Sequence, residues 1–163
     1  MRKVISDASP LIALSIVDGL NWLPQLFDEV WVPEQVRAEV LSDKQVRGEA
    51  EIQQAIHKNW LKIWDKPITS LINLDLDEGE SACINLALAN PEPVLLIIDE
   101  KAGRAVAQEK GIQIVGTAAI IGMAKNKGFI PSARDVFEVL HTSDFRISGN
   151  VIKTILTRVG EFE

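Results

Sequence analysis

Four acidic residues occupy positions where a carboxylate could take part in chemistry: Asp7, Glu39, Glu80 and Asp99. If several of them converge, their mutual repulsion requires a counter-charge. The natural one is Mg²⁺ or Mn²⁺, because these hard ions prefer oxygen ligands. Two such ions can activate a water and stabilise the leaving oxygen in phosphodiester hydrolysis, and this chemistry needs no catalytic histidine.

Two of the acids follow apolar runs that are typical of strands. Asp7 comes after Val4–Ile5, and Asp99 ends the run that begins at Leu95. Ligands of open α/β sheets bind at the carboxyl ends of strands, which favours a functional interpretation of both acids. Pro10 suits a first helical position and would leave Asp7 outside the helix start, with the residue before the proline, Ser9, as N-cap. For Asp99, an N-cap role in the next helix stays open as the simpler alternative.

The other two acids lie within predicted helices. In the helix predicted over Glu78–Ala89, Glu80 projects from the apolar face, where an unpaired carboxylate is costly. Either Glu80 closes a capping box with Asp77, which otherwise fits an ordinary helix N-terminus, or it points into a site. Glu39 lies at the flank of an apolar stripe in the predicted helix Pro33–Leu41, where a solvated charge is the simpler alternative.

Apolar runs alternate with helical periodicity along the chain, which predicts a parallel sheet covered by helices on both faces. The expected strands are Lys3–Ser6, Val30–Val32, Leu61–Trp64, Val94–Ile98 and Ile112–Val115. The expected helices are Pro10–Val17, Leu20–Phe27, Pro33–Leu41, Gln45–Lys58, Glu78–Ala89, Ala102–Lys110, Ala118–Asn126, Ser132–Leu140 and Ser148–Val159. The short, continuous and apolar fourth strand is expected to be the central one.

The 163 residues predict one domain over 1–163, with a helical C-terminal extension over 128–163. The apolar runs are too short to cross a bilayer, and polar residues interrupt the first run too early for a signal peptide, so a cytoplasmic protein is expected. The single cysteine, Cys83, excludes an internal disulfide and is expected in the core. His57 and His141 are expected in surface or capping roles.

The net charge of −6 argues against tight non-specific binding to nucleic acid. Nine of the 17 basic residues follow position 100, so the charge is unevenly distributed. Two of them, Lys101 and Arg104, stand just beyond Asp99 and are candidates for binding a substrate phosphate; solvent-facing helix charge is the alternative.

Five segments together resemble the PIN-domain ribonucleases, and within them the PIN-like proteins described as predicted nucleic-acid-binding proteins, relatives of VapC-type toxins. The segments are VISDASPLIAL at 4–14, VPEQVRAEV at 32–40, LDEGESA at 76–82, LIIDEKAGR at 96–104 and VGT at 115–117. Their order and spacing carry the resemblance, which covers most of the chain.

The resemblance implies a three-layer α/β/α sandwich whose parallel sheet has the order 3-2-1-4-5. It places the four family acids on Asp7, Glu39, Glu80 and Asp99 as catalytic residues and Mg²⁺ or Mn²⁺ ligands. Ser9 and Thr117 match small hydroxyl positions that can bind a metal-coordinated water or a phosphate, although helix capping is their simpler explanation. The implied activity is an endoribonuclease acting on single-stranded RNA, leaving a 3′-hydroxyl and a 5′-phosphate. The resemblance also implies a small antitoxin protein as partner, a homodimeric state and no association with a membrane.

The sequence departs from the familiar toxins at two positions, since Glu80 replaces the commoner aspartate and no further acid follows the fifth strand. A single essential metal ion is therefore one outcome to expect. The rival hypothesis is a catalytically silent PIN-like module that binds RNA or a protein partner. A phosphatase of the haloacid-dehalogenase type fits less well, because it expects an acid at the position of Ser9. A receiver domain fits worse still, because it expects a lysine at Gly116–Thr117.

Overall fold

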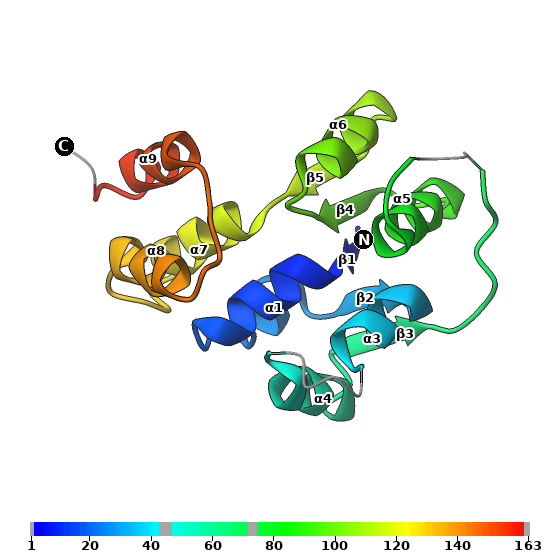
Figure 1. The fold of residues 1–163 in the computed structure, drawn as a ribbon, viewed down its shortest axis with the longest axis horizontal. Coiled ribbons are helices and arrows are strands. Elements are labelled where there is room, and N and C mark those ends of the chain that lie inside the picture. Colours follow the sequence, from blue (N-terminus) through cyan, green and yellow to red (C-terminus); the bar gives the residue numbers. More distant parts are fainter. Residues whose placement is uncertain (1, 43–46, 72–74, 162–163) are drawn as a thin grey trace.

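A five-stranded parallel sheet forms the centre of the molecule (Figure 1). The structure, a computed structural model, describes residues 2–42, 47–71 and 75–161. The strands are β1 Lys3–Ser6, β2 Val30–Pro33, β3 Leu61–Trp64, β4 Val94–Ile97 and β5 Gln113–Val115. Their order is β3-β2-β1-β4-β5 with every neighbouring pair parallel, which confirms the predicted architecture.

The pairing of β1 with β4 brings two of the candidate acids to one edge of the sheet. Ser6 lies opposite Ile97, and the backbone N–H of Asp7 donates to the carbonyl of Ile97 at 2.9 Å. Because the strands are parallel, Asp7 and Asp99 both emerge at the carboxyl ends. The prediction that the fourth strand is central was wrong, since β1 is the middle strand; β4 lies beside it and is buried at every residue, as its continuous apolar run predicted.

The helices alternate with the strands as the periodicity predicts. They are α1 Ala8–Ile16, α2 Trp22–Phe27, α3 Glu34–Val40, α4 Glu49–His57, α5 Glu78–Ala89, α6 Lys101–Glu109, α7 Thr117–Asn126, α8 Ala133–Thr142 and α9 Gly149–Arg158. Residues 45 and 46 of the predicted helix Gln45–Lys58 lie outside the described residues. Helix α5 packs on β1, β2 and β4, whereas α8 and α9 pack on α7 and form the helical extension seen on the left of Figure 1.

Several predicted helix starts differ from the structure, and two of them bear on the candidate site. Helix α1 begins at Ala8, so Asp7 stands at the N-cap position and Ser9 lies inside the first turn. Pro10 is tolerated there because the N–H groups of the whole first turn lack a helical partner, so none is lost. Likewise α7 begins at Thr117 with Gly116 as its N-cap, so neither hydroxyl residue holds the capping position assigned to it.

The predictions for cysteine and histidine are confirmed. Cys83 is fully buried on α5, with its Sγ 3.5 Å from the carbonyl of Ser6, and burial raises the pKa of its thiol. His57 and His141 are exposed in the last turns of α4 and α8. Within the described part of the chain, the helices are too short and too polar to span a bilayer.

Candidate functional site

Asp7 is a buried carboxylate directly after the carboxyl end of β1. Its side chain is 4% exposed and makes no capping hydrogen bond to α1. Burial raises the pKa of Asp7 to about 7; the backbone N–H of Ala8 opposes this rise, and the negative charges of Asp77, Glu39 and Asp99 add to it. Asp7 therefore lies in a space where negative charge is concentrated, and among the described residues no Lys or Arg forms an ion pair with it.

Glu39 reaches the same space from α3. A Cβ atom built on Gly79, in the first turn of α5, would lie 3.3 Å from both Asp7 Oδ1 and Glu39 Oε1. The two oxygens thus cannot be further apart than twice that distance. Partial burial and the charge of Asp77 raise the pKa of Glu39. Glu39 is exposed as a whole, yet its Oε1 and Asp7 Oδ1 both lie next to Gly79.

Glu80 combines the two interpretations that its sequence position left open. The side chain of Asp77 accepts a hydrogen bond from the Glu80 N–H at 2.8 Å, which is the first half of a capping box. The Glu80 side chain is nevertheless buried, and among the described residues its Oε1 has no hydrogen-bond partner. This oxygen lies 2.9 Å from the position of a Cβ built on Gly103 of α6. Burial, then the side chain of Asp77 and the charge of Asp7, raises the pKa of Glu80 to about 8.

Asp99 is held by α7. The backbone N–H of Thr117 donates to its Oδ1 at 2.8 Å, and the Thr117 hydroxyl donates to its Oδ2 at 2.6 Å. The alternative that Asp99 caps the helix after it was wrong, because Glu100 holds the N-cap position of α6. The charge of Asp99 also reaches the buried acids, since it contributes to the raised pKa of Asp7.

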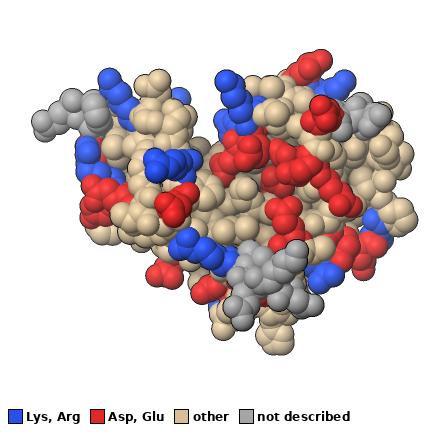
Figure 2. Space-filling view, viewed as in Figure 1, with Lys and Arg blue, Asp and Glu red and all other residues tan. Residues whose placement is uncertain are grey.

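The candidate phosphate-binding residues border a groove of about 1000 Å³ that opens beside Asp99. Its lining includes Ser9, Lys101 and Arg104. Lys101 is exposed in the first turn of α6, while Arg104 is half-buried and donates from Nη1 to the carbonyl of Ile98 at 3.0 Å. Figure 2 shows this hollow between two lobes, with acidic side chains gathered on the right-hand lobe and basic side chains on both sides.

One member of the acidic cluster was missed by the reasoning from sequence. Asp77 was interpreted as an ordinary helix N-terminal residue, and it does cap α5. Its charge also raises the pKa values of Asp7, Glu39 and Glu80, so it belongs to the same electrostatic unit. The available signal was the density of acids around Gly79 in the segment Asp77-Glu78-Gly79-Glu80.

The side chains around this space fit a hard divalent cation by their chemistry. Among the residues that the structure describes, no three His, Cys, Asp or Glu side chains form a ready-made metal site. The donors that do gather are all carboxylates, one of them has a buried oxygen without a partner, and three have raised pKa values. A cation of the Mg²⁺ or Mn²⁺ type would satisfy the buried oxygen and offset the repulsion.

Comparison with known proteins identifies the family of the chain. A family profile described as a PIN domain matches residues 3–161. Among the curated proteins, none gives a significant match to the chain.

Proposed function

This chain belongs to the PIN-domain family, which has a nuclease-type fold, and from that premise we propose that it is a metal-dependent endoribonuclease acting on single-stranded RNA. The observation that carries the proposal is that Asp7 Oδ1 and Glu39 Oε1 both lie next to Gly79, while the neighbouring Glu80 has a buried Oε1 without a hydrogen-bond partner among the described residues. Buried carboxylates that repel one another destabilise the folded state unless a cation binds between them.

In this proposal Asp7, Glu39, Glu80 and Asp99 hold Mg²⁺ or Mn²⁺. When bound, the ion supplies an activated water and stabilises the charge on the leaving oxygen. Thr117 fixes the orientation of Asp99 through its two hydrogen bonds. Lys101 and Arg104 bind and orient the substrate phosphate at the edge of the acidic cluster, and Ser9 lines the same groove.

The test is cleavage of a labelled single-stranded RNA with Mn²⁺ present. Asp7→Asn and Asp99→Asn should each abolish cleavage while the circular dichroism spectrum stays that of the wild type. Asp65→Asn removes one exposed carboxylate outside the cluster and serves as the matched control. Full activity in both site variants would refute the assignment.

Metal binding is tested separately by calorimetric titration. Glu80→Gln preserves the shape of the side chain and removes its charge. We expect it to weaken Mn²⁺ binding by more than the roughly 10-fold that loss of an outer-shell partner typically costs. An unchanged affinity would remove Glu80 from the site.

The resemblance to VapC-type toxins extends the proposal to a cytoplasmic toxin with a small antitoxin partner and a homodimeric state. Expression of the wild-type chain should then arrest growth, and Asp7→Asn should relieve the arrest. Growth that is unaffected by the wild-type chain, under conditions where it cleaves RNA in vitro, would contradict the toxin role and leave the ribonuclease proposal standing.

The second candidate is a catalytically silent PIN-like module that binds RNA or a protein partner. One observation favours it: within the described part of the chain, the carboxylates are not assembled into a ready-made metal group. The same titration separates the two candidates, because a silent module should bind neither Mg²⁺ nor Mn²⁺ at millimolar concentrations.

A further inference from the structure

The groove beside Asp99 has a second wall that belongs to the C-terminal extension. One wall is the exposed side of α6, with Lys101 and Arg104. The other wall is formed by α9, which carries Arg158, and by the segment before it, which carries Arg146. Figure 1 shows α6 and α9 on opposite sides of the segment that joins β5 to α7. The extension thus faces the candidate site across an open groove.

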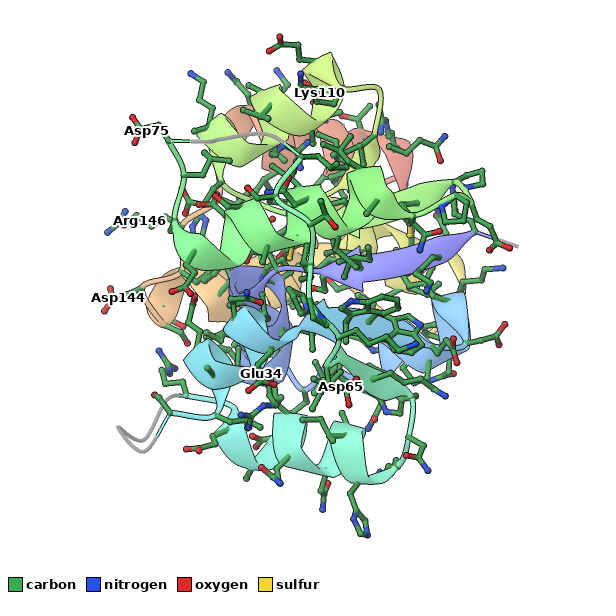
Figure 3. The ribbon with its side chains drawn as sticks, turned by 90° about the vertical axis from the view of Figure 1, so that its right-hand side faces the viewer. Glu34, Asp65, Asp75, Lys110, Asp144 and Arg146 are labelled. Atoms are coloured by element: carbon green, nitrogen blue, oxygen red, sulfur yellow. The ribbon has the colours of Figure 1, made fainter. Side chains whose placement is uncertain are left out.

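Charges of both signs line the groove. Its acidic residues are Asp99 and Glu100, which follow β4, and Asp144, which lies in the segment before α9. Arg146 and Arg158 are exposed, and neither forms an ion pair with another described residue. In Figure 3 the side chain of Arg146 extends away from the ribbon, and it belongs to the lining of the groove.

Helix α9, which forms part of the second wall, is packed against α7 and tied to α8. A Cβ on Gly122 of α7 would lie 2.9 Å from Ile155 Cγ2, so α9 packs closely on α7 at this glycine. The carboxylate of Glu161 accepts hydrogen bonds from the N–H of Ala133 at 2.6 Å and from the hydroxyl of Ser132 at 3.1 Å, which ties the chain after α9 to the start of α8. These contacts fix α9, and with it the backbone of Arg158, relative to α7 and α8.

We propose that a single strand of RNA occupies this groove, with its phosphates bound between Lys101 and Arg104 on one wall and Arg146 and Arg158 on the other. The inference rests on the proposed function for its ligand and adds two binding residues from the C-terminal extension. Cations on both walls suit a polyanionic backbone, and Asp99 in the lining connects the groove to the candidate catalytic site.

The size and lining of the groove favour this occupant. Its volume of about 1000 Å³ is at the upper end of ordinary ligand pockets, which suits a few nucleotides of single strand and not a duplex. Apolar side chains, among them Phe145, Ile147 and Val151, also line the groove, and the bases of a single strand can pack on them. The four cationic side chains of the lining are what favour a polyanion over a protein segment.

The experiment measures binding of a fluorescent single-stranded RNA oligomer by anisotropy, with Ca²⁺ present to offset the acidic end, over a range of salt concentrations. Each phosphate contact on a single strand contributes about 0.7 to the slope of log K against log salt. The double variant Arg146→Ala/Arg158→Ala should therefore lower the slope by about 1.4 and weaken binding roughly 25-fold at about 0.1 M salt. Arg146→Lys/Arg158→Lys should restore most of the slope.

The matched control is Lys110→Ala/Lys127→Ala, which removes two exposed cations outside the groove and should leave the slope unchanged. Equal losses in the two double variants, or equal affinity for a duplex of the same sequence, would overturn the inference. So would a wild type that does not bind the single strand. Absence of Mn²⁺-dependent cleavage alongside the expected binding pattern would refute the ribonuclease and leave the binding groove standing. If the wild type cleaves RNA and Arg146→Ala/Arg158→Ala binds the single strand as tightly as the wild type, the binding groove is refuted and the ribonuclease proposal stands.

Discussion

Thr117 donates a hydrogen bond to each carboxylate oxygen of Asp99, from its backbone N–H to Oδ1 at 2.8 Å and from its hydroxyl to Oδ2 at 2.6 Å. An acid at the end of β4 thus satisfies a first-turn N–H of α7, which follows the neighbouring strand β5. Each carboxylate oxygen retains further lone-pair sites for a cation or a substrate. The contact therefore fixes the direction of Asp99 without using up its capacity to bind.

Thr117→Val removes the hydroxyl bond and leaves a similar volume. Because Thr117 is fully buried and its partner is ionised, we expect the free energy of unfolding to fall by about 1.5–3 kcal/mol. Urea denaturation measures the change. Thr117→Ser keeps the hydroxyl and should lose less; equal losses in Val and Ser would show that the methyl group, and not the hydrogen bond, is what matters.

Asp7→Asn should stabilise the metal-free protein at alkaline pH. The pKa of Asp7 is raised from 3.8 to about 7, so its contribution to stability is complete below about pH 4 and is lost as the pH rises through about 7. Asparagine has the same shape and does not ionise. With EDTA present, the variant should gain on the order of a few kcal/mol over the wild type at pH 8, and little at pH 4.

Urea denaturation at the two pH values tests this expectation, and the exposed Asp65→Asn is its control. If the difference in unfolding free energy between Asp7→Asn and the wild type is the same at both pH values, ionisation of Asp7 is not its cause. Addition of Mn²⁺ should narrow the gap at pH 8, since a bound cation favours the ionised carboxylate of the wild type.

Gly79→Ala separates helix stability from site function. Its Cβ would lie 3.3 Å from Asp7 Oδ1 and Glu39 Oε1 and would enter the space where these carboxylates meet. Alanine favours the helix by up to about 1 kcal/mol, and this gain opposes the cost of the two close contacts, so stability should change little. Mn²⁺ affinity should fall by about tenfold or more, as when the support of a metal site is disturbed.

Gly149→Ala is the paired control for this substitution, because a Cβ at the first residue of α9 meets nothing within 4 Å. It offers a similar gain in helix propensity and should leave the metal affinity unchanged. Calorimetric titration of both variants decides the matter, and equal affinities would place the cation away from Gly79.

Glu161→Ala should loosen the C-terminal extension. Burial raises the pKa of Glu161, but the N–H groups of Ala133 and Arg134 and the Ser132 hydroxyl outweigh this and hold it below its usual value. The carboxylate therefore stabilises the fold above about pH 4.5, and this contribution is lost as the pH falls. At pH 7 we expect a loss of about 1–2 kcal/mol, comparable to the removal of a helix cap.

The loss should shrink toward pH 3, where Glu161 of the wild type also becomes protonated. Glu138→Ala, an exposed carboxylate on α8, supplies the comparison and should change stability little. Denaturation curves at pH 3 and pH 7 measure both variants. A loss at pH 7 that is equal in the two would mean that net charge, and not capping of α8, is responsible.

The sequence by itself determined where the elements lie and which end of the sheet carries the acids. The runs before Asp7 and Asp99 are short, apolar and continuous, and both became buried parallel strands with the acids at their carboxyl ends. The helix predicted over Glu78–Ala89 has the same bounds in the structure. Such features follow from local periodicity and capping chemistry, which a chain carries within a few neighbouring residues.

Tertiary structure decided what those acids face. The true start of α1, the bond between Asp99 and Thr117, the unpartnered oxygen of Glu80 and the second wall of the groove all arise between segments far apart in the chain. Asp77 joined the cluster for the same reason, because α5 packs beside β1 and α3. The direction and ionisation of a carboxylate depend on the charges and packed surfaces that surround it, and only the assembled fold supplies them.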